Sequence, residues 1–484
     1  MTATPKKILI AVGNGFAFRY FLSSGLASAI GGRGNNVELL GDEGFAVPSQ
    51  FKFIQGNRQI VAAIDSTSRT KRYCQLLRAN FLPKSVECNT IWQFRQQELS
   101  KCGYIKKLIL GSCWFFLRHI AFVRRILIKI ETKVSQVSIL DGALSSGKFD
   151  AVIVGGFSGF KFDEIVGKAA NRRGIPVVAA ILSWDNLSGL GYRYFSPDLT
   201  LVWSEKMREE AVRIHRCDER KVRIVGAIPF FKHFEILSGS LTSSGRCRKS
   251  GERLNVSFLS KSPKRFSFNL ALFKRIHSQV RAIGLDVHWF VRLHPLSLRT
   301  HDDGRLIFQN EIDGFRDHAN KFGNVELSLP EAKGTRVIFD DPDNDLSLYL
   351  SILERSDLVI SMFSTAMLEC ALLGKMTVNI CVPNSIFEIS EATGSQVVSD
   401  RQDLYSDFNQ DHIQAVLDVG EIETFYSVES LVEKIHKLFR RDRFLVDYPK
   451  TKLVGGLNFD APVKNALSEI SEMLSEGESG VAEG

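Results

Sequence analysis

The sequence has no long apolar run and no paired cysteine motif. A membrane-spanning helix needs about 20 consecutive apolar residues, and no stretch of this chain approaches that length. The eight cysteines include no Cys-x-x-Cys pair, which is typical of reduced thiols and not of a disulfide scaffold or a zinc site. The apolar run at residues 8–12 is too short for a secretory leader. We therefore expect a cytoplasmic protein without a transmembrane helix.

Acidic residues are scarce in the first 150 positions. That segment holds 21 Lys and Arg but only 9 Asp and Glu, although the whole chain of 484 residues has a net charge of +8. This asymmetry suggests an acidic partner, such as nucleic acid, an anionic lipid or a phosphorylated acceptor. Nucleic acid is not expected, because no recognised binding motif accompanies the basic residues.

Short apolar runs alternate with helical patterns through most of the chain. Such βα alternation predicts parallel, doubly wound sheets, and a single core rarely grows beyond about 250–300 residues. We therefore expect an α/β protein with two Rossmann-like domains that face a cleft. The small, polar and basic segment between the two series is the predicted linker. The predicted division is residues 1–237, linker 238–253, residues 254–440, a returning segment 441–470 and a disordered tail 471–484.

Residues 356–375 predict a strand, a polar turn and a buried helix. Ser361, Ser364 and Thr365 crowd the turn, and hydroxyls beside free helical N–H groups favour an anion. Glu369 lies one turn further along the helix, where its carboxylate could bind a sugar hydroxyl. The alternative is an ordinary capped core helix.

A second candidate site follows the strand at residues 287–293. Arg292 and His294 alternate there, so we expect both to point to one side, with Pro295 fixing the turn. His294 could donate a hydrogen bond to a phosphoryl oxygen. Lys261, in the basic loop that also contains Arg265, is a further phosphate candidate. The alternatives are a strand-end histidine satisfied by its neighbours and a solvated basic loop.

The first strand is followed by a glycine turn, Gly13-Asn14-Gly15, and then by a helix that carries Arg19. The third glycine of the dinucleotide fingerprint is missing, so an ordinary tight turn is the preferred interpretation. Arg19 and the turn could still face the cleft. Residues 51–54 and 60–64 could form short strands.

Residues 106–130 predict one or two amphipathic helices with a basic edge. Four cations, Arg118, Arg124, Arg125 and Lys129, interrupt their apolar residues. This pattern fits a helix on an anionic membrane surface. A core-facing helix with solvated arginines is the alternative.

Three motifs in order resemble a known group of enzymes: LSWDNL at 182–187, VRLHP at 291–295 and the Ser/Thr-rich helix start at 361–369. They are similar to motifs of GT-B glycosyltransferases, in particular bacterial sialyltransferases, CDP-glycerol glycerophosphotransferases and capsule or surface-polysaccharide transferases. The resemblance implies that the His-Pro pair and the hydroxyl-rich helix start hold nucleotide phosphates. It covers most of residues 150–385 and is only architectural before that.

The LSWDNL loop departs from this group. The corresponding loop of the glycerophosphotransferases has a Trp-His-Gly sequence whose histidine is the proposed base, whereas Trp184 is followed here by Asp185. An aspartate can also deprotonate an acceptor hydroxyl, which makes Asp185 the candidate base. The alternative is that Asp185 and Asn186 cap a turn.

The acidic run at residues 340–345 could suggest a metal site. It lacks the glycine and the distal glutamate of a calcium loop and directly precedes a predicted helix, where Asp and Asn act as caps. We therefore expect capping, and no metal or other cofactor.

The predicted function is transfer of a sugar, or a polyol phosphate, from a nucleotide donor to a glycan or lipid-linked acceptor in surface-polysaccharide assembly. It would operate at the inner face of a membrane. Two alternatives stay open: a non-hydrolysing UDP-sugar 2-epimerase, and a non-catalytic binding protein that kept the fold.

Overall fold

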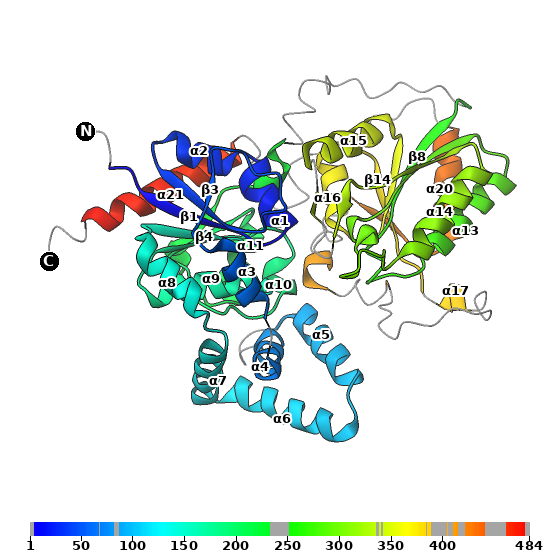
Figure 1. Ribbon diagram of the computed structural model, residues 1–484. Helices are drawn as coiled ribbons and strands as arrows, with labels where there is room; N and C mark the ends of the chain where they lie inside the picture. The colour runs from blue at the N-terminus through cyan, green and yellow to red at the C-terminus, as the bar shows by residue number, and fades with distance from the viewer. Residues whose placement is uncertain are drawn as a thin grey trace. The chain divides into compact units, whose positions relative to one another are not determined.

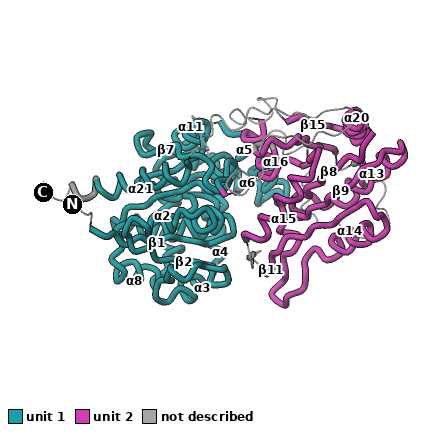
Figure 2. Tube along the Cα trace, turned by 90° about the horizontal axis from the view of Figure 1, so that it is seen from above, with its two compact units in different colours: residues 1–231, 454–484 teal, residues 232–453 magenta. Residues whose placement is uncertain are grey.

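The computed structural model forms two compact units, coloured separately in Figure 2. Unit 1 comprises residues 1–231 and 454–484, and unit 2 comprises residues 232–453. The predicted linker 238–253 therefore begins just beyond the division, although most of it lies outside the described residues. The residues that the structure describes are 4–66, 68–81, 87–232, 251–334, 338–339, 342–383, 385–388, 404, 410–414, 422–440 and 461–479.

Unit 1 is built on a seven-stranded sheet with the strand order β3-β2-β1-β4-β5-β6-β7. All of its neighbouring strands are parallel; Ile8, for example, pairs with Val37 on one side and Ala151 on the other. The apolar runs seen in the sequence are buried along their whole length in β4, β5 and β6, as expected for a sheet covered on both faces. The strands are β1 (Lys7–Val12), β2 (Asn36–Gly41), β3 (Lys52–Phe53), β4 (Ala151–Val154), β5 (Val177–Ala180), β6 (Leu199–Val202) and β7 (Val222–Ile224).

The helices of unit 1 include a group, α4 to α7, inserted between β3 and β4. Figure 1 shows α4 framed by α5, α6 and α7. Residues 60–64, expected as a strand, belong to helix α3, because Asn57, Ile60 and Ile64 are buried at helical spacing. The helices are α1 (Gly15–Phe18), a π-helical turn η1 (Arg19–Ser23), α2 (Leu26–Gly32), α3 (Asn57–Asp65), α4 (Arg69–Ala79), α5 (Asn89–Ser100), α6 (Tyr104–His119), α7 (Ala121–Val134), α8 (Ser138–Gly147), α9 (Lys161–Arg172), α10 (Asn186–Gly189) and α11 (Glu205–Arg213).

Unit 2 contains a six-stranded parallel sheet with the order β10-β9-β8-β13-β14-β15. Its strands are β8 (Leu254–Leu259), β9 (Val287–Arg292), β10 (Val325–Ser328), β13 (Leu358–Ser361), β14 (Thr377–Ile380) and β15 (Glu423–Phe425), and β11 (Ala332–Lys333) pairs separately with β12 (Ile338–Phe339). Its helices are α13 (Asn269–Ala282), the 3-10 turn η4 (Pro295–Leu298), α14 (Gln309–Lys321), α15 (Pro342–Arg355), α16 (Thr365–Leu372), α17 (Ser385–Glu388) and α20 (Val428–Phe439). The two parallel sheets confirm the predicted α/β fold with two Rossmann-like domains.

The C-terminal helix α21 (Pro462–Ser479) belongs to unit 1, where it packs on α2. Its Ala466 and Ile470 are buried, and Arg223 donates to Glu469 at 2.9 Å. The prediction that the disordered tail begins at residue 471 is therefore wrong for residues 471–479. This acidic, serine-rich stretch continues a helix whose earlier turns are anchored by buried apolar side chains. None of the described helices has the length and apolar character needed to cross a membrane.

Candidate functional site

Three predicted loops of unit 2 follow three neighbouring strands. Residues 260–262 follow β8, residues 293–295 follow β9, and residues 362–364 follow β13. Strand β8 lies between β9 and β13 in the sheet, so the three loops meet at one edge, which we call the β9–β8–β13 edge. Ligands of open parallel sheets bind beyond the carboxyl ends of their strands, and this edge is the candidate site.

The loops after β8 and β9 are tied together by hydrogen bonds. The Ser260 amide donates to the Arg292 carbonyl at 3.0 Å, and the His294 amide donates to Ser260 Oγ at 2.8 Å. The Asn269 side chain accepts from the Lys261 amide at 2.9 Å and donates to the Lys261 carbonyl at 3.0 Å. The backbone of Lys261, a predicted phosphate ligand, is thus held beside the His294 turn.

His294 is a neutral hydrogen-bond donor at physiological pH in this setting. The Leu296 amide donates to its Nδ1 at 3.1 Å, so the proton of the neutral ring is assigned to Nε2. Burial, and then the positive charge of Lys261, lower the pKa of His294 to about 4. Pro295 begins the η4 turn directly afterwards. A ring with a fixed Nε2–H suits contact with a phosphoryl oxygen.

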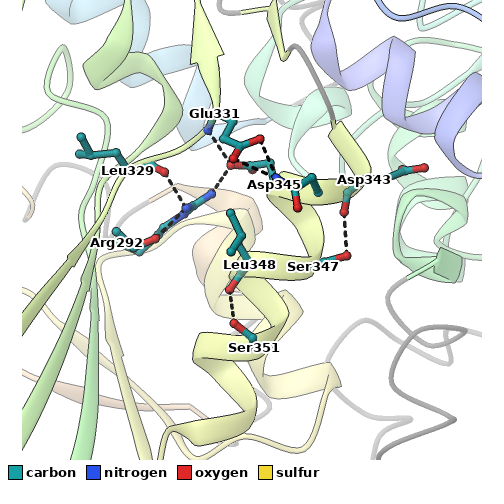
Figure 3. Close-up of polar contacts among 10 residues, drawn as sticks. Arg292, Leu329, Glu331, Asp343, Asp345, Ser347, Leu348 and Ser351 are labelled. Atoms are coloured by element: carbon teal, nitrogen blue, oxygen red, sulfur yellow. Dashed lines mark hydrogen bonds and ion pairs between the residues drawn. The ribbon is translucent and has the colours of Figure 1, made fainter.

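Arg292 has a role that its sequence position did not indicate. Figure 3 shows its guanidinium reaching from β9 to the first turn of α15, where it pairs with Asp345 at 2.5 Å. It also donates to Ser328 Oγ at 2.8 Å and to the Leu329 carbonyl at 3.0 Å. Strand β9 ends at Arg292, so His294 lies in the following turn and the expected alternation on one strand does not hold. Nucleotide binding by Arg292 stays a prediction.

The described part of the acidic run lies within α15, and capping of the helix by this run stays a prediction. Asp343 and Asp345 lie in the first turn of α15, and Asp345 also accepts from the Glu331 amide at 2.8 Å. Asp340 and Asp341 lie outside the described residues. Among the described side chains there is no group of three or more His, Cys, Asp or Glu placed to hold a metal ion.

The turn between β13 and α16 combines hydroxyls with an unusual backbone. Ser361, fully buried at the end of β13, lies 3.0 Å from Ser364 through their hydroxyls. Phe363 has a φ of 39°, a left-handed conformation that is uncommon for a bulky residue and often marks functional sites. Thr365 begins α16, and the buried Glu369 lies one turn later. Hydroxyls and helical N–H groups therefore lie together at the N-terminus of α16, and Glu369 lies one turn further along the helix.

Sequence reasoning missed a buried carboxyl behind the β8 loop. Glu311 Oε1 accepts from Asn269 at 2.9 Å, whereas Glu311 Oε2 and the buried Ser262 Oγ have no hydrogen-bond partner among the described residues. Burial raises the pKa of Glu311 to about 7. Asn269 and Glu311 are 42 residues apart on α13 and α14, so no local motif could have linked them.

The predicted residues of unit 1 follow β1 and β5 at the carboxyl edge of its sheet. Asn14 Oδ1 caps α1 by accepting from the Ala17 amide at 2.9 Å. A Cβ on Gly13 would lie 2.6 Å from the Phe162 ring, so Gly13 is required for packing. Gly15 opens α1, and Arg19 begins the π-helical turn.

Asp185, the candidate base, stands at the N-terminus of the short helix α10. It is half-buried, and its side chain makes no capping hydrogen bond. With its amide in the orientation that satisfies both of its ends, Asn186 donates to Asp185 Oδ1 at 3.2 Å, so both the base and the turn-capping interpretation stay open. Strand β4 lies between β1 and β5, so the Asp185 loop and the glycine turn share the same edge of the sheet.

Comparison with solved structures identifies the fold type. No protein-family model and no curated protein sequence matches the chain. Among solved structures, the S. aureus MnaA–UDP co-structure matches with a TM-score of 0.51 at 9% identity, covering 97% of each chain. The Methanocaldococcus jannaschii UDP-GlcNAc 2-epimerase in complex with UDP-GlcNAc and UDP matches with a TM-score of 0.50 at 10% identity, covering 97% of this chain and 99% of that one. At such identity the likeness shows the fold alone, which is the GT-B type of two Rossmann-like domains.

Proposed function

We propose that this chain is a glycosyltransferase that moves a sugar, or a related polyol phosphate, from a nucleotide donor to a glycan or lipid-linked acceptor. The observation that carries the proposal is the β9–β8–β13 edge. Neighbouring strand ends there present a neutral His294 donor, the Lys261 loop and the hydroxyl-rich start of α16. Each of these groups favours a phosphate.

The donor would bind with its phosphates on the α16 N-terminus. Ser364 and Thr365 would add hydroxyl donors, and Glu369 would accept from a sugar hydroxyl of the nucleotide. The Nε2–H of His294 would stabilise the negative charge that develops on the departing phosphate. Asp185 of unit 1 would take the proton from the acceptor hydroxyl as it attacks. No metal or other cofactor takes part in this proposal.

The setting that we propose is surface-polysaccharide assembly at the inner, cytoplasmic face of a membrane. The basic composition of residues 1–150 suits an acidic acceptor. Residues 106–130 are the segment proposed to contact the membrane.

The first test is a thermal-shift titration with CMP, CDP, UDP and GDP. A ligand that binds the folded state raises its stability by RT ln(1 + [L]/Kd), about 2.7 kcal/mol at a hundredfold excess over Kd. We expect one cytidine or uridine nucleotide to stabilise the chain. Glu369→Gln and His294→Ala should each weaken this response about tenfold or more, whereas His301→Ala, an exposed histidine of the same unit, should not. No response to any nucleotide would refute the proposal.

An epimerase is the second candidate, because the solved structures with the same fold include UDP-GlcNAc 2-epimerases. The two activities differ in their need for an acceptor. Incubation with UDP-GlcNAc alone, followed by NMR of the sugar, distinguishes them. Epimerised sugar without any acceptor would establish the epimerase, and nucleotide release that requires an acceptor would establish the transferase. Binding without turnover would indicate a non-catalytic protein.

A further inference from the structure

The loop between β8 and α13 is closed on itself by the side chain of Asn269. This residue is fully buried at the first position of α13. Its Oδ1 accepts from the Lys261 amide at 2.9 Å, and its Nδ2 donates to the carbonyls of Lys261 at 3.0 Å and of Phe266 at 2.9 Å. One side-chain amide therefore satisfies both backbone groups of Lys261 and also holds the far end of the loop.

The side chain of Asn269 serves the loop and not its own helix. Asparagine at a helix start commonly caps the free N–H groups of the first turn. The N-cap residue of α13 is instead Phe268, which makes no side-chain capping bond. The four hydrogen bonds of the Asn269 side chain reach the β8 loop and α14. A residue whose chemistry suits capping is thus used to hold the loop.

The same loop is tied to the His294 turn on its other side. The Ser260 amide donates to the Arg292 carbonyl at 3.0 Å, and Ser260 Oγ accepts from the His294 amide at 2.8 Å. After burial, the positive charge of Lys261 is the second cause of the lowered pKa of His294, so the ammonium group lies near the ring. The backbone of Lys261 is therefore clamped between Ser260 and Asn269.

Glu311 connects Asn269 to a further element. Asn269 Nδ2 donates to Glu311 Oε1 at 2.9 Å, in the first turn of α14. Helix α14 packs against η4, the turn that follows His294. Lys261 and His294, the two predicted phosphate ligands, are thus joined through a closed circuit of the β8 loop, α13, α14 and η4. Asn269 is the side chain in this circuit that bonds directly to the Lys261 backbone.

We propose that Asn269 is a positioning residue of the donor site, which holds the Lys261 backbone so that the Lys261 side chain meets the phosphates of the nucleotide beside His294. This inference rests on the proposed function, because it requires phosphates at the β9–β8–β13 edge. A cation held in place binds an anion more tightly, since the loop does not have to be ordered on binding. Asn269 itself touches no ligand and acts through Lys261.

The first test measures the affinity of the full chain for CDP and for UDP by calorimetric titration. Without the Asn269 amide, the backbone groups of Lys261 lose their partner and the loop has to rearrange. We expect Asn269→Ala to weaken binding of the preferred nucleotide about tenfold, the lower end of what one hydrogen bond to a charged group contributes.

The matched control is Asn324→Ala, which removes another asparagine of unit 2. The Asn324 side chain donates to the Val287 carbonyl at 2.8 Å, at the opposite, amino end of β9. This variant also loses a side-chain hydrogen bond to the backbone, but it leaves the β9–β8–β13 edge untouched. Its nucleotide affinity should equal that of the wild type.

A double-variant cycle separates positioning from a general structural role. Lys261→Met removes the charge and should by itself weaken nucleotide binding about tenfold. If Asn269 acts through Lys261, the double variant Asn269→Ala/Lys261→Met should bind no more weakly than Lys261→Met. A second tenfold loss in the double variant would show that Asn269 acts by another route and would overturn the proposal.

Hydrogen exchange in the wild type tests the clamp without any substitution. We expect the Lys261 amide, which is bonded to a buried side chain, to be protected about as well as the amides of β8. Exchange of this amide at the rate of an exposed loop would overturn the proposal, even if Asn269→Ala failed to fold.

Failure of this inference and failure of the proposed function give different results. Nucleotide binding that Asn269→Ala leaves unchanged would overturn the positioning role and leave the donor site intact. Absence of binding by the wild type to CMP, CDP, UDP and GDP would refute the proposed function, and the positioning role with it.

Discussion

Two titratable side chains near the β9–β8–β13 edge respond to burial in opposite senses. Burial disfavours the charged form of any group, so it lowers the pKa of His294 to about 4 and raises that of Glu311 to about 7. Near neutral pH, His294 is uncharged and Glu311 is partly protonated. The positive charge that acts on His294 is then that of Lys261, which suits an anionic ligand.

The raised pKa of Glu311 predicts a pH-dependent stability. Its protonated form is favoured in the folded state, so the stabilisation is complete below the unfolded pKa near 4.5 and is lost as the pH rises through about 7. Glu311→Gln keeps the shape and removes the titration. From pH 5 to pH 8 the wild type should lose about 1–3 kcal/mol of its free energy of unfolding that the variant keeps. Urea unfolding at both pH values measures this difference.

The control for this prediction is Glu209→Gln, which changes an exposed carboxylate of unit 1. It should unfold like the wild type at both pH values. If Glu311→Gln instead shows the same pH dependence as the wild type, Glu311 ionises normally in the folded state and the burial argument is wrong.

At the scale of secondary-structure elements, the Arg292–Asp345 pair joins β9, β10 and α15. Both side chains are buried; Asp345 also accepts a hydrogen bond from the Glu331 amide, and Arg292 donates to Ser328 of β10. The first turn of α15 is therefore fixed against the sheet next to the candidate site. Asp345 was predicted only as part of a capping run, and its partner could not be read from the sequence because the two residues are 53 positions apart.

Removal of one partner of this pair should be costly. A buried charge left without its partner destabilises a protein by about 3–5 kcal/mol, so Asp345→Ala should lower the free energy of unfolding of unit 2 by an amount in that range. Denaturant unfolding measures the loss of free energy of unfolding. Hydrogen exchange in β9 and α15 shows whether the loss falls on these elements. Asp303→Ala removes a carboxylate from an exposed pair with Arg305 and should change little. A loss of similar size in both variants would contradict the argument.

At the scale of the whole molecule, the chain begins and ends in the same unit. Helix α21 covers part of unit 1 through Ala466 and Ile470, which are almost fully buried. Residues from the far end of the sequence thus complete the first core, although a large second unit separates them.

Deletion of residues 461–484 should destabilise unit 1 selectively. Exposure of the surface under Ile470 alone costs about 1.5–3 kcal/mol, and the Arg223–Glu469 pair is lost as well. Hydrogen exchange should accelerate in α2 and β6, which contact α21, but not in β8 and β9 of unit 2. Unchanged protection in α2 would show that α21 is not part of the unit 1 core.

Much of the secondary structure followed from local pattern. Apolar runs bounded by turn residues indicated the strands of both sheets, and their regular alternation with helical patterns indicated parallel pairing. Pattern failed at residues 60–64, where a short apolar run suited either a strand or a helix, and at residues 471–479, where polar composition suggested disorder. At residues 60–64 a buried helical face decided the outcome, and at residues 471–479 the helix continues from turns whose Ala466 and Ile470 are buried. Such a face exists only when a neighbouring element covers it.

The sequence by itself determined the α/β class and the existence of two Rossmann-like domains. It also determined that hydroxyl, histidine and lysine side chains follow β8, β9 and β13. All of these features depend on the order of residues along each strand and turn. Tertiary structure alone decided what each side chain contacts. It assigned Arg292 to Asp345, Asn269 to Glu311 and a left-handed backbone to Phe363. Burial and pairing across tens of residues are properties of the packed chain, and they set charge, pKa and strain at the site.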